Sequence, residues 1–211
     1  MIKYGVLLLL CCISWSARSK VLDVDYASFY SHVSKINKEE TNKLRFAFGF
    51  KHIAQDRLCN LVEANIVTQK QTIPLTIENG VRFTVPTDKV LKMAKAVVAI
   101  EFADNVNQCD MSVQLETKPN ILQQEYTYKE LRSLLSQYKA FFANMGSFMS
   151  FMMPSATGLV MHFSEQVNLS EANATLLDKE GNLTLDQAWF EQEQGLSLPI
   201  MPLRITALVE K

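Results

Sequence analysis

The sequence predicts an α+β protein that is mostly β, in which two antiparallel, sandwich-like β modules flank one long amphipathic helix. Two observations lead to this prediction. Short segments with apolar residues at every second position recur on both sides of the middle of the chain, and between them the apolar spacing changes to alternating steps of four and three. The first pattern is typical of half-buried strands, and the second is typical of a helix with one apolar face.

Residues 1–19 have the composition of a cleaved secretory signal peptide. Lys3 supplies a positive charge, an apolar run covers residues 6–13, and small residues precede Lys20 at positions that suit signal peptidase. The run is shorter than the roughly 20 apolar residues that an uncleaved anchor needs. We therefore expect an exported protein whose mature chain begins near Lys20.

Removal of the signal peptide changes both the net charge and the cysteine count. The remaining chain has 19 basic and 22 acidic residues, and this net charge of −3 argues against a nucleic-acid partner. Its two cysteines, Cys59 and Cys109, form an even pair, which in an oxidising compartment predicts one disulfide. The sequence contains no C-x-x-C motif that would favour a redox or metal pair instead.

Residues 20–118 are predicted to form the N-terminal β module. A short segment with apolar residues at helical spacing, from Tyr26 to Ile36, comes first. About six strands follow, identified by alternating apolar residues, and they cover residues 44–53, 58–68, 72–77, 81–85, 96–102 and 111–115. The turn at residues 78–80 joins two of these strands and predicts a hairpin. Asp23 and Asp25 stand before Tyr26, where we expect them to cap the leading helix.

The central segment, residues 119–154, is predicted to hold one helix of roughly seven turns. Thr127 and Glu130 form a capping box at its start, and Pro154 ends it. The apolar residues of its stripe are Leu131, Leu135, Tyr138, Phe142, Met145, Met149 and Met152. Its second half has no charged residue on the opposite face, so it is suited to packing on both sides.

Residues 140–164 contain no charged side chain, which raises the question of a membrane span. We exclude a span because the turn after Pro154 would leave backbone groups unsatisfied in lipid. We favour a helix held between two β layers. The alternative is a groove for a lipid tail or for the helix of a partner. The candidate contact residues of such a groove are Phe148, Met149, Met152 and Met153.

Residues 155–211 are predicted to form the C-terminal β module. Its strands are GLVMHF and LRITALVE, and the turn DKEGN predicts a hairpin between ATLL and LTL. Trp189 and Phe190 precede the polar run EQEQ, and we interpret them as an aromatic anchor of a solvated loop or as a contact surface. The triplet EAN begins at Glu63 and again at Glu171, which leaves open whether one module is a degenerate copy of the other.

The sequence offers few candidates for catalysis. It has three histidines and seven glycines, and it lacks the motifs of serine hydrolases, zinc proteases and nucleotide-binding loops. His162 stands out of phase with the apolar residues of its strand, and we expect a hydrogen-bonded structural histidine. Asp104 and Asp110 bracket a loop that lacks the glycine and glutamate of a calcium site. We therefore expect no catalytic residue, no metal and no cofactor.

Segments distributed over the chain carry a family resemblance. They are the signal peptide, FYSHVSKI, LRFAFGF, PLTIENGVRFTVP, the helix ending FMMP, GLVMHF and PLRITALVE. Together they resemble an uncharacterised family of exported gammaproteobacterial proteins that is known only as a domain of unknown function. The resemblance implies a periplasmic location and implies no activity, cofactor or catalytic residue.

These observations favour a non-catalytic binding or envelope-assembly module in the periplasm. Its expected partner is an envelope protein or a lipid of unknown identity. A carrier of a small apolar ligand or lipid and an enzyme of unrecognised type are the alternatives.

Overall fold

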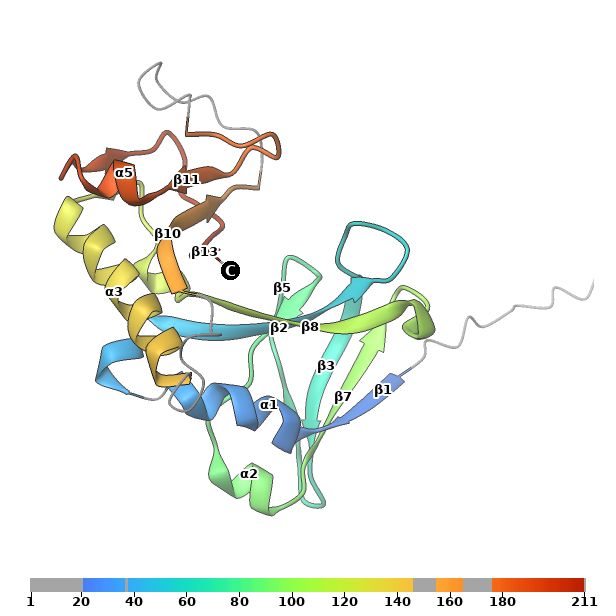
Figure 1. The fold of residues 1–211 in the computed structure, drawn as a ribbon. Helices are drawn as coiled ribbons and strands as arrows, with labels where there is room; N and C mark the ends of the chain where they lie inside the picture. The colour runs from blue at the N-terminus through green and yellow to red at the C-terminus, as the bar shows by residue number, and fades with distance from the viewer. Residues whose placement is uncertain (1–20, 37, 146–154, 165–175, 211) are drawn as a thin grey trace, which may run out of the picture.

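The computed structural model of the chain describes residues 21–36, 38–145, 155–164 and 176–210 (Figure 1). Over these residues the chain forms antiparallel sheets with a few helices, and this confirms the prediction of a mostly β, α+β protein. The helices are α1 (Tyr26–Val33), α2 (Lys89–Met93), α3 (Tyr128–Met145) and α5 (Gln187–Phe190), with short 3-10 turns η1 (Ser34–Ile36), η2 (Glu39–Thr41), η3 (Val106–Gln108) and η4 (Pro119–Ile121).

Two four-stranded sheets are formed within residues 20–118, the range predicted as the N-terminal module. The first sheet has the order β1 (Val21–Asp25), β7 (Val97–Phe102), β3 (Leu61–Val67) and β4 (Thr72–Pro74). The second sheet has the order β5 (Ile77–Glu78), β6 (Arg82–Phe83), β2 (Leu44–His52) and β8 (Cys109–Thr117). The predicted hairpin is confirmed, because β5 pairs with β6 in antiparallel register.

The C-terminal strands form a third sheet and a small fourth one. The third sheet has the order β11 (Leu183–Leu185), β10 (Ser155–His162) and β13 (Arg204–Glu210), and β9 (Glu125–Tyr126) pairs with β12 (Leu196–Ser197) in the fourth. The predicted turn between ATLL and LTL is confirmed by the bridge between Leu177 and Leu183. The second copy of the EAN triplet lies outside the described residues, so the duplication stays open.

The core of the N-terminal module is built on one face of β2. Phe46, Phe48 and Phe50 alternate along this strand and are all buried. The ring of Phe48 meets the ring of Phe29 in α1 at a centroid distance of 4.9 Å, and Phe50 meets Phe102 in β7 at 4.8 Å. One face of β2 therefore holds α1 and the first sheet against the second sheet.

Helix α3 contacts strands of both the second sheet and the third. Its capping box is confirmed, since the backbone N–H of Thr127 donates to Glu130 over 2.8 Å and Glu130 N–H lies 3.3 Å from the Thr127 hydroxyl oxygen. Tyr138 is fully buried, donates to the carbonyl of Ile205 in β13 over 2.6 Å, and lies 3.1 Å from the hydroxyl of Thr117 in β8. Residues 146–154 lie outside the described residues, and so does the predicted end of the helix at Pro154.

Several elements differ from the prediction. The expected strand at residues 72–77 is two strands, because the chain crosses from the first sheet to the second between β4 and β5. Asp23 and Asp25, expected to cap the leading helix, instead belong to the edge strand β1, and Asp25 precedes α1 without a side-chain capping bond. The short helices α2 and α5 and the two-residue strands β9 and β12 were not predicted, because they are too short to show a period.

The predicted disulfide between Cys59 and Cys109 is present. Both cysteines are buried, and the bond ties the segment before β3 to the first residue of β8. It therefore links the first sheet to the second at the end opposite to α3. Within the described ranges, no helix has the length and apolar character that crossing a bilayer requires.

We expect the Cys59→Ala/Cys109→Ala variant to lose stability because its unfolded chain regains the freedom of a loop of 50 residues. The chain-entropy relation predicts a loss of about 4 kcal/mol for a loop of this length. Urea unfolding at neutral pH would measure this difference. The reduced wild-type protein should unfold at about the same urea concentration as the variant. A variant as stable as the oxidised wild type would contradict the prediction.

Candidate functional site

A cleft of about 570 Å³ lies between the second sheet and the segment that leads into β13. Its charged side chains are Arg45, Glu78, Arg82, Glu116 and Arg204, and we call it the arginine cleft. Its apolar lining includes Ile77, Leu122, Met201, Pro202 and Leu203. The cleft therefore combines residues from both ends of the chain.

The strand register brings four of these charged residues, all except Arg204, to one face of the second sheet. Arg45 is paired with Glu116 across β2 and β8, and Arg82 is paired with Glu78 across β6 and β5. Directly paired residues point to the same side of a sheet. Arg45 alternates with the phenylalanines of β2, so this face is the one opposite to the core.

Gly49 permits the close approach of β6 to β2. A Cβ atom on Gly49 would lie 2.7 Å from the carbonyl oxygen of Val81 and 3.3 Å from Cγ of Arg82. The first distance is shorter than side chains tolerate, so an alanine there would push the β6 backbone away. The absence of a side chain on Gly49 therefore sets the position of Arg82 in the cleft.

Arg45 is fully engaged within the protein. It donates to Glu78 over 2.7 Å through Nη1 and to Glu116 over 2.7 Å through Nη2, and its Nε donates to Glu116 over 3.0 Å. Burial lowers the pKa of Arg45, but the hydrogen bonds and charges of Glu78 and Glu116 outweigh this effect and raise it. Glu116 is only 3% exposed and accepts two hydrogen bonds from Arg45.

Arg82 and Arg204 are less well satisfied. Nε and Nη1 of Arg82 and Nε of Arg204 are buried, and none of the three has a hydrogen-bond partner among the described residues. Burial lowers the pKa of both side chains, and the charge of Arg204 lowers that of Arg82 further, while Glu116 opposes the shift. Two guanidinium groups therefore share a desolvated place, and Glu116, the carboxylate whose charge acts on both of them, is already bonded to Arg45.

His162 lies beside this group on β10, where it is paired with Arg204. Its Nδ1 lies 2.9 Å from Oδ1 of Asn182 and its Nε2 lies 3.0 Å from the hydroxyl of Thr206. The amide oxygen of Asn182 can only accept, so Nδ1 carries the proton and Nε2 accepts from Thr206. Burial and the charge of Arg204 lower the pKa of His162 to about 4. Both ring nitrogens of His162 are therefore hydrogen-bonded, as expected, and the side chain is neutral at pH 7.

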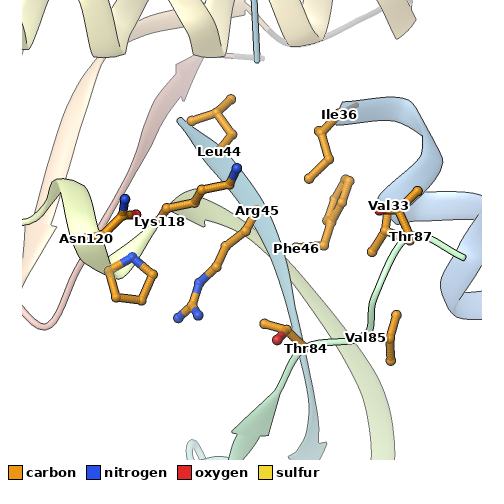
Figure 2. A pocket seen from close by; sticks show the side chains of 11 residues that line it. Val33, Ile36, Leu44, Arg45, Phe46, Thr84, Val85, Thr87, Lys118 and Asn120 are labelled. Atoms are coloured by element: carbon orange, nitrogen blue, oxygen red, sulfur yellow. The ribbon is translucent and has the colours of Figure 1, made fainter. Parts of the chain in front are cut away.

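A smaller pocket of about 350 Å³ adjoins the arginine cleft (Figure 2). Apolar side chains from α1, η1 and β2 form one side, where Figure 2 shows Val33, Ile36 and Phe46. Arg45 and Lys118 lie across from them. Arg45 and Pro119 line both spaces, so the smaller pocket offers an apolar extension next to the charged cleft.

Two of the sequence-derived candidate contact residues, Trp189 and Phe190, are buried. They are 2% and 9% exposed, and Asp186 caps α5 by accepting from Trp189 N–H over 2.9 Å. This supports the aromatic anchor; the contact-surface hypothesis assumed an exposure that these side chains do not have. The indole Nε1 of Trp189 is buried without a hydrogen-bond partner in the described part of the chain.

The other candidate contact residues, Phe148, Met149, Met152 and Met153, lie outside the described residues. Their role as a groove for lipid or protein therefore stays a prediction. The described part of α3 buries one stripe, Leu131, Leu134, Leu135, Tyr138 and Phe141, and exposes Lys129, Arg132 and Lys139 on the opposite face, so packing on both sides is not tested for the rest of the helix.

The loop at Asp104 is occupied by protein contacts. Asp104 accepts from Arg57 over 3.0 and 2.7 Å and from the backbone N–H of Asn60 over 2.7 Å. The hydrogen bonds from Arg57 and then from Asn60 lower the pKa of Asp104 to about 2. The oxygens of Asp104 thus serve a surface ion pair near the disulfide.

The arginine cleft was not predicted, although the sequence contains a signal for it. Arg45, Arg82 and Arg204 each stand between two apolar residues near the start of an alternating strand, as L-R-F, V-R-F and L-R-I. A single arginine at such a position normally indicates the solvent-facing side of a strand. Only the pairing of β2 with β6, and the position of β13 beside β8, show that the three converge.

Comparison with known proteins gives one match. The model of a family described as a protein of unknown function, DUF2987, matches residues 18–163, which is more than half of the chain. No curated protein and no solved structure matches. The matched range contains Arg45, Glu78, Arg82 and Glu116, whereas Arg204 lies beyond it.

We expect the stability of the wild-type protein to fall between about pH 7 and pH 4 partly because of His162. The imidazole takes up a proton in the unfolded chain near pH 6.5, whereas in the folded protein its pKa is about 4. Acid therefore favours the unfolded state over this window. The His162→Gln variant, which cannot titrate, should lose stability less steeply. Urea unfolding at several pH values tests this, and parallel curves for the two proteins would contradict it.

Proposed function

We propose that this chain, which belongs to the DUF2987 family, is an exported, non-catalytic binding protein that holds an anionic ligand in the arginine cleft. One observation carries the proposal. Arg82 and Arg204 place buried guanidinium N–H groups at the cleft without hydrogen-bond partners among the described residues.

The energetic cost of this arrangement supports a ligand. A buried donor without an acceptor costs about 1–3 kcal/mol, and a buried charge costs more. Apolar side chains of similar volume at Arg82 and Arg204 would avoid that cost. An oxyanion in the cleft would instead supply the missing acceptors and offset the repulsion between the two guanidinium groups.

The geometry of the donors favours a ligand with a phosphate or carboxylate group. Guanidinium groups bind phosphate and carboxylate groups through charge-assisted hydrogen bonds to more than one oxygen, which gives the interaction geometric specificity. The volume of about 570 Å³ lies in the range of small-molecule sites. The apolar side chains of the adjoining pocket, such as Ile36 and Phe46, provide room for a less polar part of the same ligand.

Binding without turnover is supported by the state of the nearby titratable groups. Both ring nitrogens of His162 are hydrogen-bonded and its pKa is depressed, so it is a poor proton acceptor at pH 7. Glu78 and Glu116 are held by Arg45. These groups suit a fixed charge pattern better than proton transfer.

Export is supported by the composition of residues 1–19 and by the cysteine pair. The bond between Cys59 and Cys109 suits an oxidising compartment such as the periplasm. An apolar-ligand carrier is the second candidate, favoured by the pocket between α1 and β2. This pocket is smaller than the arginine cleft and has a cationic rim at Arg45 and Lys118, so the carrier function is the weaker candidate.

Titration with inorganic phosphate at constant ionic strength tests the proposal. We expect saturable binding by calorimetry to the wild-type protein, and an affinity lower by at least about tenfold for Arg82→Met and for Arg204→Met, because each variant removes a buried partner of the anion. The unfolding midpoint of each variant without phosphate should equal or exceed that of the wild type, because an uncompensated buried charge is removed.

Arg132→Met is the matched control, since Arg132 lies on α3 and its guanidinium contacts Tyr128. It should bind phosphate as the wild type does. Two results would refute the proposal. One is unchanged phosphate binding in the double Arg82→Met/Arg204→Met variant. The other is the combination of lower stability in the variants with no detectable phosphate binding by the wild-type protein, which would assign the arginines a structural role.

A further inference from the structure

We propose that the end of the first sheet next to α2 binds the surface of an anionic phospholipid bilayer. This surface consists of Val90 and Met93 with Lys70, Lys89, Lys92 and Lys95, and we call it the lysine tip. It is separate from the arginine cleft and does not depend on the proposed function. Figure 1 shows α2 at one extremity of the molecule, far from the C-terminal strands.

The two apolar side chains of the lysine tip are unusually exposed. Val90 is 70% exposed and Met93 is 73% exposed, more than any other large apolar side chain in the described residues. They are three positions apart on a helix, so they point to neighbouring parts of one face. A short surface helix normally turns its apolar residues to the core. In α2 the core-facing position is occupied by Leu91, which is only 6% exposed.

The lysine tip is held in position by the fold. The side chain of Asp88 caps α2 by accepting from Val90 N–H over 2.7 Å, and Leu91 is buried in the core where α2 meets α1. Lys95 has a positive φ of 51° and ends the helix directly before buried Ala96. Val90 and Met93 are therefore presented by a fixed element and not by an unsupported loop.

All charged residues of the helix segment that carries Val90 and Met93 are positive. Residues 89–95 contain Lys89, Lys92 and Lys95 and no acidic residue, in a chain with a formal net charge of −1. Lys92 lies 5.2 Å from the centre of the Tyr30 ring. The three lysines are exposed around Val90 and Met93.

A fourth lysine comes from the turn between β3 and β4. Val67 is paired with both Thr72 and Val97, so the turn that holds Lys70 lies at the same end of the sheet as the residues that follow α2. Val67 is itself 37% exposed. Of the acidic residues at this end, Asp88 is used as the helix cap and Asp25 ends β1 opposite Val97.

This combination fits a bilayer surface. Apolar side chains in the centre can enter the region between headgroups and acyl chains, while the surrounding lysines meet anionic phosphates. The flexible aliphatic stems of lysine let the ammonium groups stay in water as the apolar part inserts. An anionic bilayer is therefore a partner that can interact with both the exposed apolar pair and the surrounding lysines.

Sedimentation with vesicles tests the inference in the full mature chain. We expect binding to vesicles of phosphatidylcholine mixed with phosphatidylglycerol, weak binding to phosphatidylcholine alone, and loss of binding at high salt. Val90→Ser/Met93→Ser and Lys89→Gln/Lys92→Gln should each lower the partition coefficient by at least about fivefold.

Ile53→Ser/Val62→Ser is the matched control, since both side chains are exposed, at 60% and 56%, and Val62 lies near the opposite end of the first sheet. It should bind vesicles as the wild type does, and so should Arg82→Met, which alters only the cleft. Unchanged vesicle binding in both lysine-tip variants would overturn the inference. Self-association that needs Val90 and Met93 in the absence of vesicles would also overturn it, by assigning this surface to a second copy.

Discussion

The structure depends on the alternation of side chains along β2. One face of this strand carries Phe46, Phe48 and Phe50, whose rings pack against α1, α3 and the first sheet. The other face carries Arg45, Ala47 and Gly49, of which Arg45 lines the arginine cleft. A slip of one residue in the pairing with β8 would exchange the two faces, so the same register that builds the core also places Arg45 opposite Glu116.

Helix α3 adds the second constraint, because it determines where β13 lies. Tyr138 bonds to the backbone of β13 and contacts Thr117 of β8, and burial raises the pKa of its hydroxyl far above the usual value. The backbone N–H of Lys43, just before β2, donates to Gln137 on the same helix over 2.7 Å. One turn of α3 therefore aligns β2, β8 and β13, and this alignment brings Arg204 from the C-terminal module to Arg82.

The elements with a clear period could be predicted from the sequence, and the cleft could not. The phenylalanines of β2, the capping box at Thr127 and the cysteine pair each carry a local or pairwise signal, and each proved correct. The cleft depends on the pairing of β2 with β6 and on the position of β13, a strand of another sheet, beside β8. The alternation of residues within one strand cannot express such contacts between distant segments. Trp189 left two interpretations open, an anchor and an exposed contact, and its burial next to the cap at Asp186 favours the anchor.

The two proposed binding surfaces use positive charge in different physical settings. Arg82 and Arg204 have buried nitrogens, where salt screens little and an unpaired donor is costly, so the cleft favours a small anion that enters and fits. The lysines around Val90 and Met93 are exposed, where each charge contributes little alone and is screened by salt. The first setting selects a ligand by geometry, whereas the second attracts a whole surface by the sum of its charges. Because they lie on different parts of the molecule, ligand binding in the cleft leaves the lysine tip free to meet a membrane.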